Sequence, residues 1–90
     1  MSALIYNKDK KFWNGSQRCW TDTPYEYSSN SHAYNEHKMA AKSDNTADIV
    51  YADSVEAGIE FLNKLELTDD YISDIKEMNR CILERENKND

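Results

Sequence analysis

The sequence predicts an α+β fold: an antiparallel sheet or hairpin in the N-terminal half, then two consecutive amphipathic helices packed on the sheet. In the first half, short apolar runs alternate with polar turns, which is typical of strands joined by tight connections. From residue 53 onward, apolar residues recur every three or four positions, the period of a helix with one buried face. Strands first and helices last favour a helical pair on one face of an antiparallel sheet.

A β-hairpin is predicted at Asn14-Gly15, because Asn and Gly accept the positive φ angles that a two-residue type I′ turn requires. Residues 12–13 lead into this turn, and residues 16–21 form the returning strand. The apolar run that begins near Leu4 is expected to add a third strand to the pair.

The middle of the chain is less regular. Residues 25–27 alternate in the way of a strand edge, and residues 28–35 and 43–46 have the composition of loops. Residues 36–42 suit one or two helical turns or a strand, and the sequence does not separate these alternatives. Residues 49–52 form a short β-type run.

Two helices are predicted over residues 54–65 and 69–86. Asp53 and Glu56 form a capping-box pattern before the first helix, and Thr68 is a good cap for the second. The apolar stripe of the first helix consists of Val55, Gly58, Ile59, Phe61, Leu62 and Leu65. The stripe of the second consists of Tyr71, Ile72, Ile75, Met78, Ile82 and Leu83. Because the connection is short, we expect the two stripes to share one core.

The composition is that of one small acidic domain over residues 1–90, with a net charge of −6. Residues 1–43 hold four acids and six bases, net +2, whereas residues 44–90 hold thirteen acids and five bases, net −8. Overall acidity disfavours direct binding to nucleic acid or to an anionic membrane. No apolar run approaches the ~20 residues of a transmembrane helix, so we expect a cytoplasmic protein.

No residues form a recognisable catalytic, metal or cofactor set. Cys19 and Cys81 are far apart and follow no signal-peptide pattern, which predicts two buried, reduced thiols. His32 and His37 lie near no cysteine pair and are expected to be solvent-exposed loop residues rather than zinc ligands. We therefore expect a protein that binds a partner, with no enzyme activity and no cofactor.

The acidic residues of the second half are the candidate functional groups. Some are offset by cations at helical spacing, in the pairs Glu60–Lys64, Glu77–Arg80 and Glu84–Lys88. Others have no helical partner, namely Asp44, Asp48, Asp53, Glu56, Asp69, Asp70 and Asp74. The simplest interpretation is a solvated face that keeps a small protein soluble.

A protein that presents rows of carboxylates can also occupy the phosphate-binding surface of a DNA-binding protein, whose affinity comes largely from charge. Same-face carboxylates of one helix lie about 5–6 Å apart, whereas duplex DNA carries a charge every ~1.7 Å of its axis. Two helices together, or a homodimer that aligns them, come closer to that density.

In size, acidity and order of elements, the chain resembles the small anti-defence proteins of bacteriophages that mimic DNA, in particular the anti-restriction proteins of T-even phages. This resemblance implies an inhibitor, in the host-cell cytoplasm, of a restriction nuclease that cuts modified DNA, and an antagonist of a nucleoid protein. The basic first half departs from the pattern, which argues against a wholly acidic surface and allows one acidic face. The residues that carry the resemblance, and form the expected partner-binding surface, are Asp44, Asp48, Asp53, Glu56, Glu60, Asp69, Asp70, Asp74, Glu77 and Glu84.

Two further partner classes stay open. The same electrostatics would suit an anti-CRISPR inhibitor of a Cas complex. Alternatively, the chain is a small adaptor domain whose aromatic sheet surface, around Trp13, Trp20 and Tyr25, binds another protein.

Overall fold

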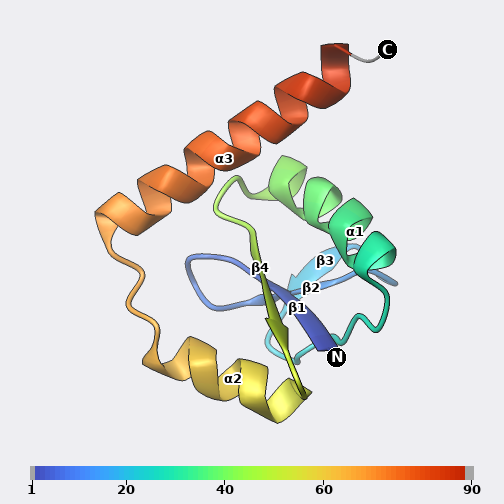
Figure 1. The fold of residues 1–90 in the computed structure, drawn as a ribbon, viewed down its shortest axis with the longest axis vertical. Coiled ribbons are helices and arrows are strands. Elements are labelled where there is room, and N and C mark those ends of the chain that lie inside the picture. Colours follow the sequence, from blue (N-terminus) through green and yellow to red (C-terminus); the bar gives the residue numbers. More distant parts are fainter. Residues whose placement is uncertain (1, 89–90) are drawn as a thin grey trace.

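The chain forms a four-stranded antiparallel sheet with helices on both faces, as seen in a computed structural model that describes residues 2–88 (Figure 1). The strand order is β3-β2-β1-β4. The elements are β1 (Ser2–Tyr6), β2 (Phe12–Asn14), β3 (Cys19–Thr21), α1 (Asn30–Ser43), β4 (Asp48–Ala52), α2 (Val55–Lys64) and α3 (Asp69–Lys88). The predicted α+β class is confirmed.

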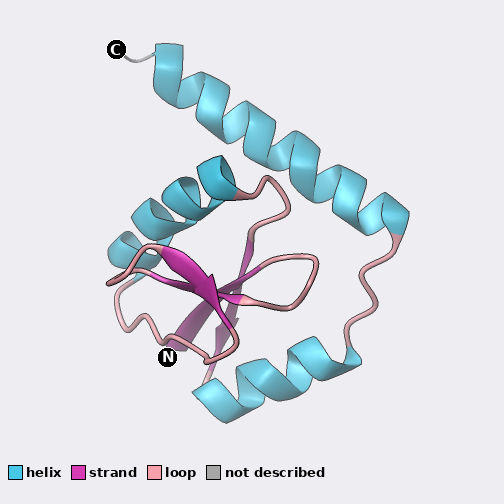
Figure 2. Ribbon diagram, turned by 180° about the vertical axis from the view of Figure 1, so that it is seen from behind, coloured by secondary structure: helices cyan, strands magenta, loops and turns pink. Residues whose placement is uncertain are grey.

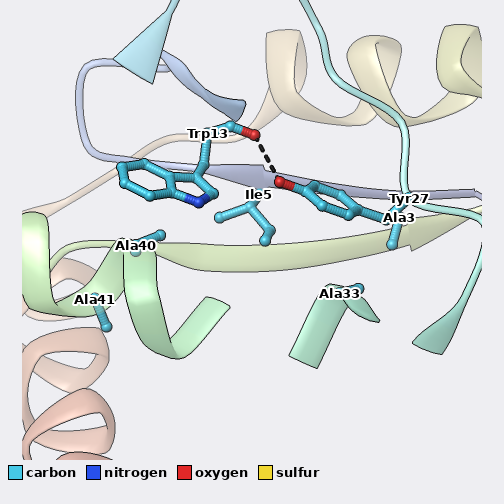
Figure 3. Packing of buried hydrophobic residues seen from close by; sticks show 8 residues of the cluster. Ala3, Ile5, Trp13, Tyr27, Ala33, Ala40 and Ala41 are labelled. Carbon is cyan, nitrogen blue, oxygen red and sulfur yellow. Dashed lines mark hydrogen bonds between the residues drawn. The ribbon is translucent and has the colours of Figure 1, made fainter. Parts of the chain in front are cut away.

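β1 lies at the centre of the molecule and is buried on both faces. Ala3 and Ile5 point into a core that α1 covers, whereas Leu4 and Tyr6 point into a second core that α2 covers. This division follows from the alternation of side chains along a strand. Figure 3 shows the α1 side, where Trp13 and Tyr27 flank Ile5.

The edges of β1 are occupied by three different segments. β4 pairs along its whole length, from Ser2↔Ala52 to Tyr6↔Asp48. On the other edge, β2 pairs only at Tyr6, and Tyr27 completes the edge through two backbone hydrogen bonds of 2.9 Å with Ala3. The strand-edge prediction for residues 25–27 is therefore confirmed, as a single bridge.

The hairpin at Asn14-Gly15 is present, but its predicted two-residue type I′ turn is wrong. The turn spans residues 15–18, the returning strand begins at Cys19, and the positive φ of 54° belongs to Arg18. The Asn14 side chain explains the longer turn, because its Oδ1 accepts hydrogen bonds from the backbone N–H groups of residues 16 and 17 at 2.9 Å each. Gly15 is needed for space, because a Cβ there would lie 2.8 Å from the Tyr27 hydroxyl.

α1 corrects the prediction of a loop over residues 28–35. The helix begins at Asn30, after Ser29, whose Oγ accepts a hydrogen bond from the amide of His32 at 3.3 Å. The open alternative for residues 36–42 is resolved as helix. Apolar periodicity did not reveal this helix because its buried face consists of small and polar residues: Ala33, Glu36, His37, Ala40 and Ala41.

α2 confirms the predicted helix near residues 54–65, but the predicted capping box is wrong. Ser54 is the N-cap and accepts a hydrogen bond from the amide of Ala57 at 3.2 Å, while Asp53 is exposed in the preceding bend. Gly58 lets the helix approach β1 closely, since a Cβ there would lie 2.9 Å from Leu4 Cδ1.

α3 begins after Thr68, as predicted, with Thr68 Oγ1 accepting from the amide of Tyr71 at 3.2 Å. The expectation that α2 and α3 share one core is wrong. α2 packs on the sheet, whereas α3 packs on α1 and contributes Leu83 to the α1-side core (Figure 1). The connector belongs to the α2 side, because its Leu65 and Leu67 pack against the α2-side core.

Asn79 joins α3 to the loop that precedes β4. Its fully buried Nδ2 donates to the carbonyl oxygens of Asn45 at 2.7 Å and of Ala47 at 2.8 Å. Within the described residues, no helix combines the length and apolar composition that crossing a bilayer requires.

Candidate partner-binding surface

The negative charge of the molecule is concentrated on one continuous stretch, residues 53–77, which we call the acidic arc. It holds eight acids and two lysines, a net charge of −6 that equals the charge of the whole chain. The arc runs through α2, the connector and the first turns of α3, and so follows the outline of the molecule from one end to the other (Figures 1 and 2). All eight carboxylate residues are exposed: Asp53, Glu56, Glu60, Glu66, Asp69, Asp70, Asp74 and Glu77.

The amphipathic pattern of α2 turns its acids outward. Gly58 and Leu62 are buried against the sheet, so Glu56 and Glu60 face solvent on the opposite side. In α3, burial of Ile75 and Asn79 places the acids of the first turns outside in the same way.

Three of the sequence-predicted acids have local cationic partners. Glu60 pairs with Lys64 at 3.2 Å. Arg80 donates to Glu77, which holds the pKa of Glu77 below its usual range, and also pairs with Glu84 at 2.8 Å. The predicted partner of Glu84, Lys88, has a side chain outside the described part of the structure, and the observed partner lies one turn earlier.

The other acids of the arc carry uncompensated charge. Among the described side chains, no ion pair involves Asp53, Glu56, Glu66, Asp69, Asp70 or Asp74. Asp69 and Asp70 lie in the first turn of α3, where the helix dipole favours anions. Glu66 was not among the acids expected at this surface, because it lies in the connector and helical periodicity does not identify it.

Asp44 and Asp48 belong to the expected surface but serve the fold. Asp44 Oδ1 accepts from the Thr46 amide at 2.9 Å and from its hydroxyl at 2.7 Å, which shapes the turn after α1. Asp48 Oδ2 accepts from the hydroxyls of Tyr6 at 3.2 Å and Tyr71 at 3.3 Å. Burial, followed by these polar neighbours, raises the pKa of Tyr6 above its ordinary value. Glu84, the remaining expected acid, lies on α3 beyond the arc.

The aromatic residues that an adaptor surface would use lie mostly in the interior. Trp13 is buried, and Trp20 packs on it edge-to-face with ring centroids 5.2 Å apart. Tyr27 is also buried and donates from its hydroxyl to the Trp13 carbonyl at 2.9 Å (Figure 3). Tyr25 is half-buried against the same core.

The histidines and cysteines differ from the sequence-based expectations. Both histidines lie on α1; His37 is buried, with its Nε2 3.1 Å from the Ala47 carbonyl oxygen, and only His32 is exposed. Both cysteines are free and exposed rather than buried, because Cys19 ends the hairpin turn and Cys81 lies on the outer face of α3. Across residues 2–88, no group of three or more His, Cys, Asp or Glu could hold a metal ion.

Fold and surface together define a small α+β domain whose exposed acids are concentrated on α2, the connector and the first turns of α3. Comparison of the chain with models of protein families, with curated proteins and with solved structures found no match.

Proposed function

We propose that the protein is a phage-type anti-restriction inhibitor that mimics DNA and blocks a host DNA-binding or DNA-cutting protein. The observation that supports this proposal is the acidic arc, whose net charge equals that of the whole chain and whose eight acids are all exposed. A basic DNA-binding surface gains most of its affinity from neutralising phosphates, so it is the natural complement of such an arc.

The arrangement of the arc suits this role better than a single helix would. Its carboxylates come from two helices and a connector, and the helices are held by different cores. Most of the charges therefore come from two separately packed helices rather than from one. A preorganised charge pattern loses less conformational entropy on binding than one on flexible loops.

The mimicry is confined to one face. Six of the eleven basic residues lie in residues 1–43, on the two hairpin turns and on α1. A target must therefore approach from the side of α2 and of the first turns of α3. Its binding should compete with duplex DNA and weaken steeply with salt, because exposed charges are screened beyond about 8–10 Å at physiological ionic strength.

The experiment is displacement of a labelled duplex from a panel of basic targets: a restriction nuclease that cuts modified DNA, a nucleoid protein and a Cas effector complex. The variant carries Glu56→Gln, Asp69→Asn, Asp70→Asn and Asp74→Asn, which removes four unpaired charges. We expect displacement by this variant to weaken at least tenfold.

The matched control carries Glu60→Gln and Glu84→Gln, which removes charges that Lys64 and Arg80 already offset. We expect a change of less than threefold for this control. Circular dichroism confirms folding of both variants. A folded fourfold variant with full activity would show that the arc only solubilises the protein, and capture of a neutral protein that resists salt would favour an adaptor.

A further inference from the structure

β4 is an edge strand whose outer backbone groups have no strand partner within the described residues. Ala3 directs both its N–H and its C=O to Tyr27, away from β4. In an antiparallel pair, two opposite residues either exchange both backbone hydrogen bonds or direct their N–H and C=O groups away from each other. Tyr51, opposite Ala3, therefore directs its N–H and C=O to the open edge, and Ile49 directs its C=O the same way.

This edge is accessible over residues 49–52. Figure 1 shows β4 in front of the other strands, and no helix crosses it in that view. Tyr51 is 47% exposed. At the start of the strand, Asn79 already occupies the Ala47 carbonyl, and Asp48 Oδ1 accepts from the Ile49 amide at 2.8 Å. The strand carries no Lys or Pro, the residues that commonly protect an edge against pairing.

A hollow of about 210 Å³ lies beside the start of β4 and is lined by Asp48, Tyr71, Asp74, Ile75 and Met78. Two carboxylates stand at an otherwise largely apolar wall, and Met78 is 41% exposed. Such a hollow fits a Lys or Arg side chain, because the aliphatic stem packs on apolar groups while the charged end meets carboxylates. On a strand added to β4, the residue opposite Asp48 would point to the same face as Asp48.

We propose that the β4 edge docks an extended, basic segment of the target protein, which adds a fifth strand and places a Lys or Arg side chain between Asp48 and Asp74. The basic character of the segment rests on the proposed function. A second copy of this chain fits less well, because it would bring the acids at both ends of β4, Asp48 and Asp53, against another molecule of net charge −6.

The first test uses two synthetic nine-residue peptides of alternating arginine and valine, one unmodified and one N-methylated at every backbone nitrogen. Methylation removes the donors that pair with a strand edge and leaves the charge unchanged. Isothermal titration calorimetry should give at least tenfold tighter binding for the unmodified peptide. Equal affinities, or no binding of either peptide, would overturn the proposal.

The second test changes the edge itself. Tyr51→Pro removes the outward N–H, which sheets tolerate at an edge strand, and Tyr51→Thr removes the same ring but keeps that N–H. We expect at least tenfold weaker peptide binding by the proline variant and a change of less than threefold by the threonine variant. Equal loss in both variants would assign binding to the ring and overturn strand addition. If the proline variant fails to fold by circular dichroism, the peptide comparison decides.

The outcomes separate this proposal from DNA mimicry. Methylation-sensitive peptide binding without duplex displacement would support strand docking and reject mimicry. Duplex displacement with no effect of methylation would support mimicry and reject strand docking. Sedimentation of the native chain completes the test: a dimer that Tyr51→Pro converts to a monomer would assign the edge to a second copy and overturn docking of a basic segment.

Discussion

Two groups of carboxylates in this molecule have opposite surroundings. Glu36, Asp44 and Asp48 are buried or half-buried and accept hydrogen bonds from residues of other elements. The acids of the acidic arc are exposed, and most of them meet no cation among the described side chains. The inner carboxylates complete the fold, and of these Asp48 also borders the hollow beside β4, whereas the outer ones leave their charge available to a partner.

The two groups differ in how strongly the stability of the fold depends on them. Removing an inner carboxylate leaves buried donors without an acceptor, which costs more than the hydrogen bond itself contributed. Removing an outer carboxylate leaves only a solvated site. Stability should therefore depend mainly on the inner acids and partner binding mainly on the outer ones, and four measurements test this difference.

The largest effect is expected from Glu36→Ala. Glu36 Oε1 accepts from the Trp13 indole at 3.1 Å inside the α1-side core, and Arg18 approaches its other oxygen at 3.8 Å. The unsatisfied indole donor should cost about 1–3 kcal/mol, before any lost packing. Urea unfolding measures this change. Glu36→Gln is the control because it keeps the acceptor, and an equal loss in both variants would assign the effect to charge.

Alkaline pH should destabilise the fold through Tyr6 and Tyr27. Burial is the main cause that raises the pKa of each phenol above its ordinary value of about 10. As pH rises, the unfolded chain therefore loses these protons before the folded chain does. The contribution of the two phenols to the free energy of unfolding is complete below pH ~10. Above that pH it falls by about 1.4 kcal/mol per pH unit for each tyrosine.

Thermal unfolding between pH 9 and 11.5 measures this loss. Tyr6→Phe removes one of the two ionising groups, so its stability should fall less steeply above pH 10 than that of the native chain. Parallel curves for the two proteins would contradict the role given to Tyr6.

A smaller effect is expected from Asp44→Ala, which removes the acceptor for two Thr46 donors and for the Asn7 amide at 3.3 Å. Asp44 is only half-buried, so water can replace part of this network. We expect a loss of about 0.5–1.5 kcal/mol in urea unfolding. Asp44→Asn keeps one acceptor oxygen and should lose less. A variant as stable as the native chain would remove Asp44 from the inner group.

The smallest effect on stability is expected from Asp74→Asn in the acidic arc. The carboxylate is exposed and has no ion-pair partner among the side chains that the structure describes, so the unfolding free energy of the protein should change by less than about 0.5 kcal/mol. The same variant should weaken binding of the arginine-valine peptide at least threefold. A large stability loss here would end the distinction between the two groups.

Helical periodicity predicted part of this structure well. α2 and α3 follow from stripes of large apolar residues, and Thr68 caps its helix through a contact within three residues. α1 was not predicted as one helix, because its buried face consists of alanines and two polar residues and therefore shows no stripe of large apolar side chains. Glu36 and His37 are satisfied by Trp13 and Ala47, which lie on other elements, so no local pattern marks them as buried.

The net charge of −6 over residues 53–77 is a property of the sequence alone, and the outward acids of α2 and α3 follow from the sequence because helical faces depend on neighbours three or four positions apart. The fold makes Asp44 and Asp48 half-buried acceptors, since their partners Asn7 and Tyr6 lie 37 and 42 positions away. It also decided the strand order that leaves β4 at the edge and the separate cores that hold α2 and α3 apart. These features depend on contacts between distant segments, which local periodicity does not encode.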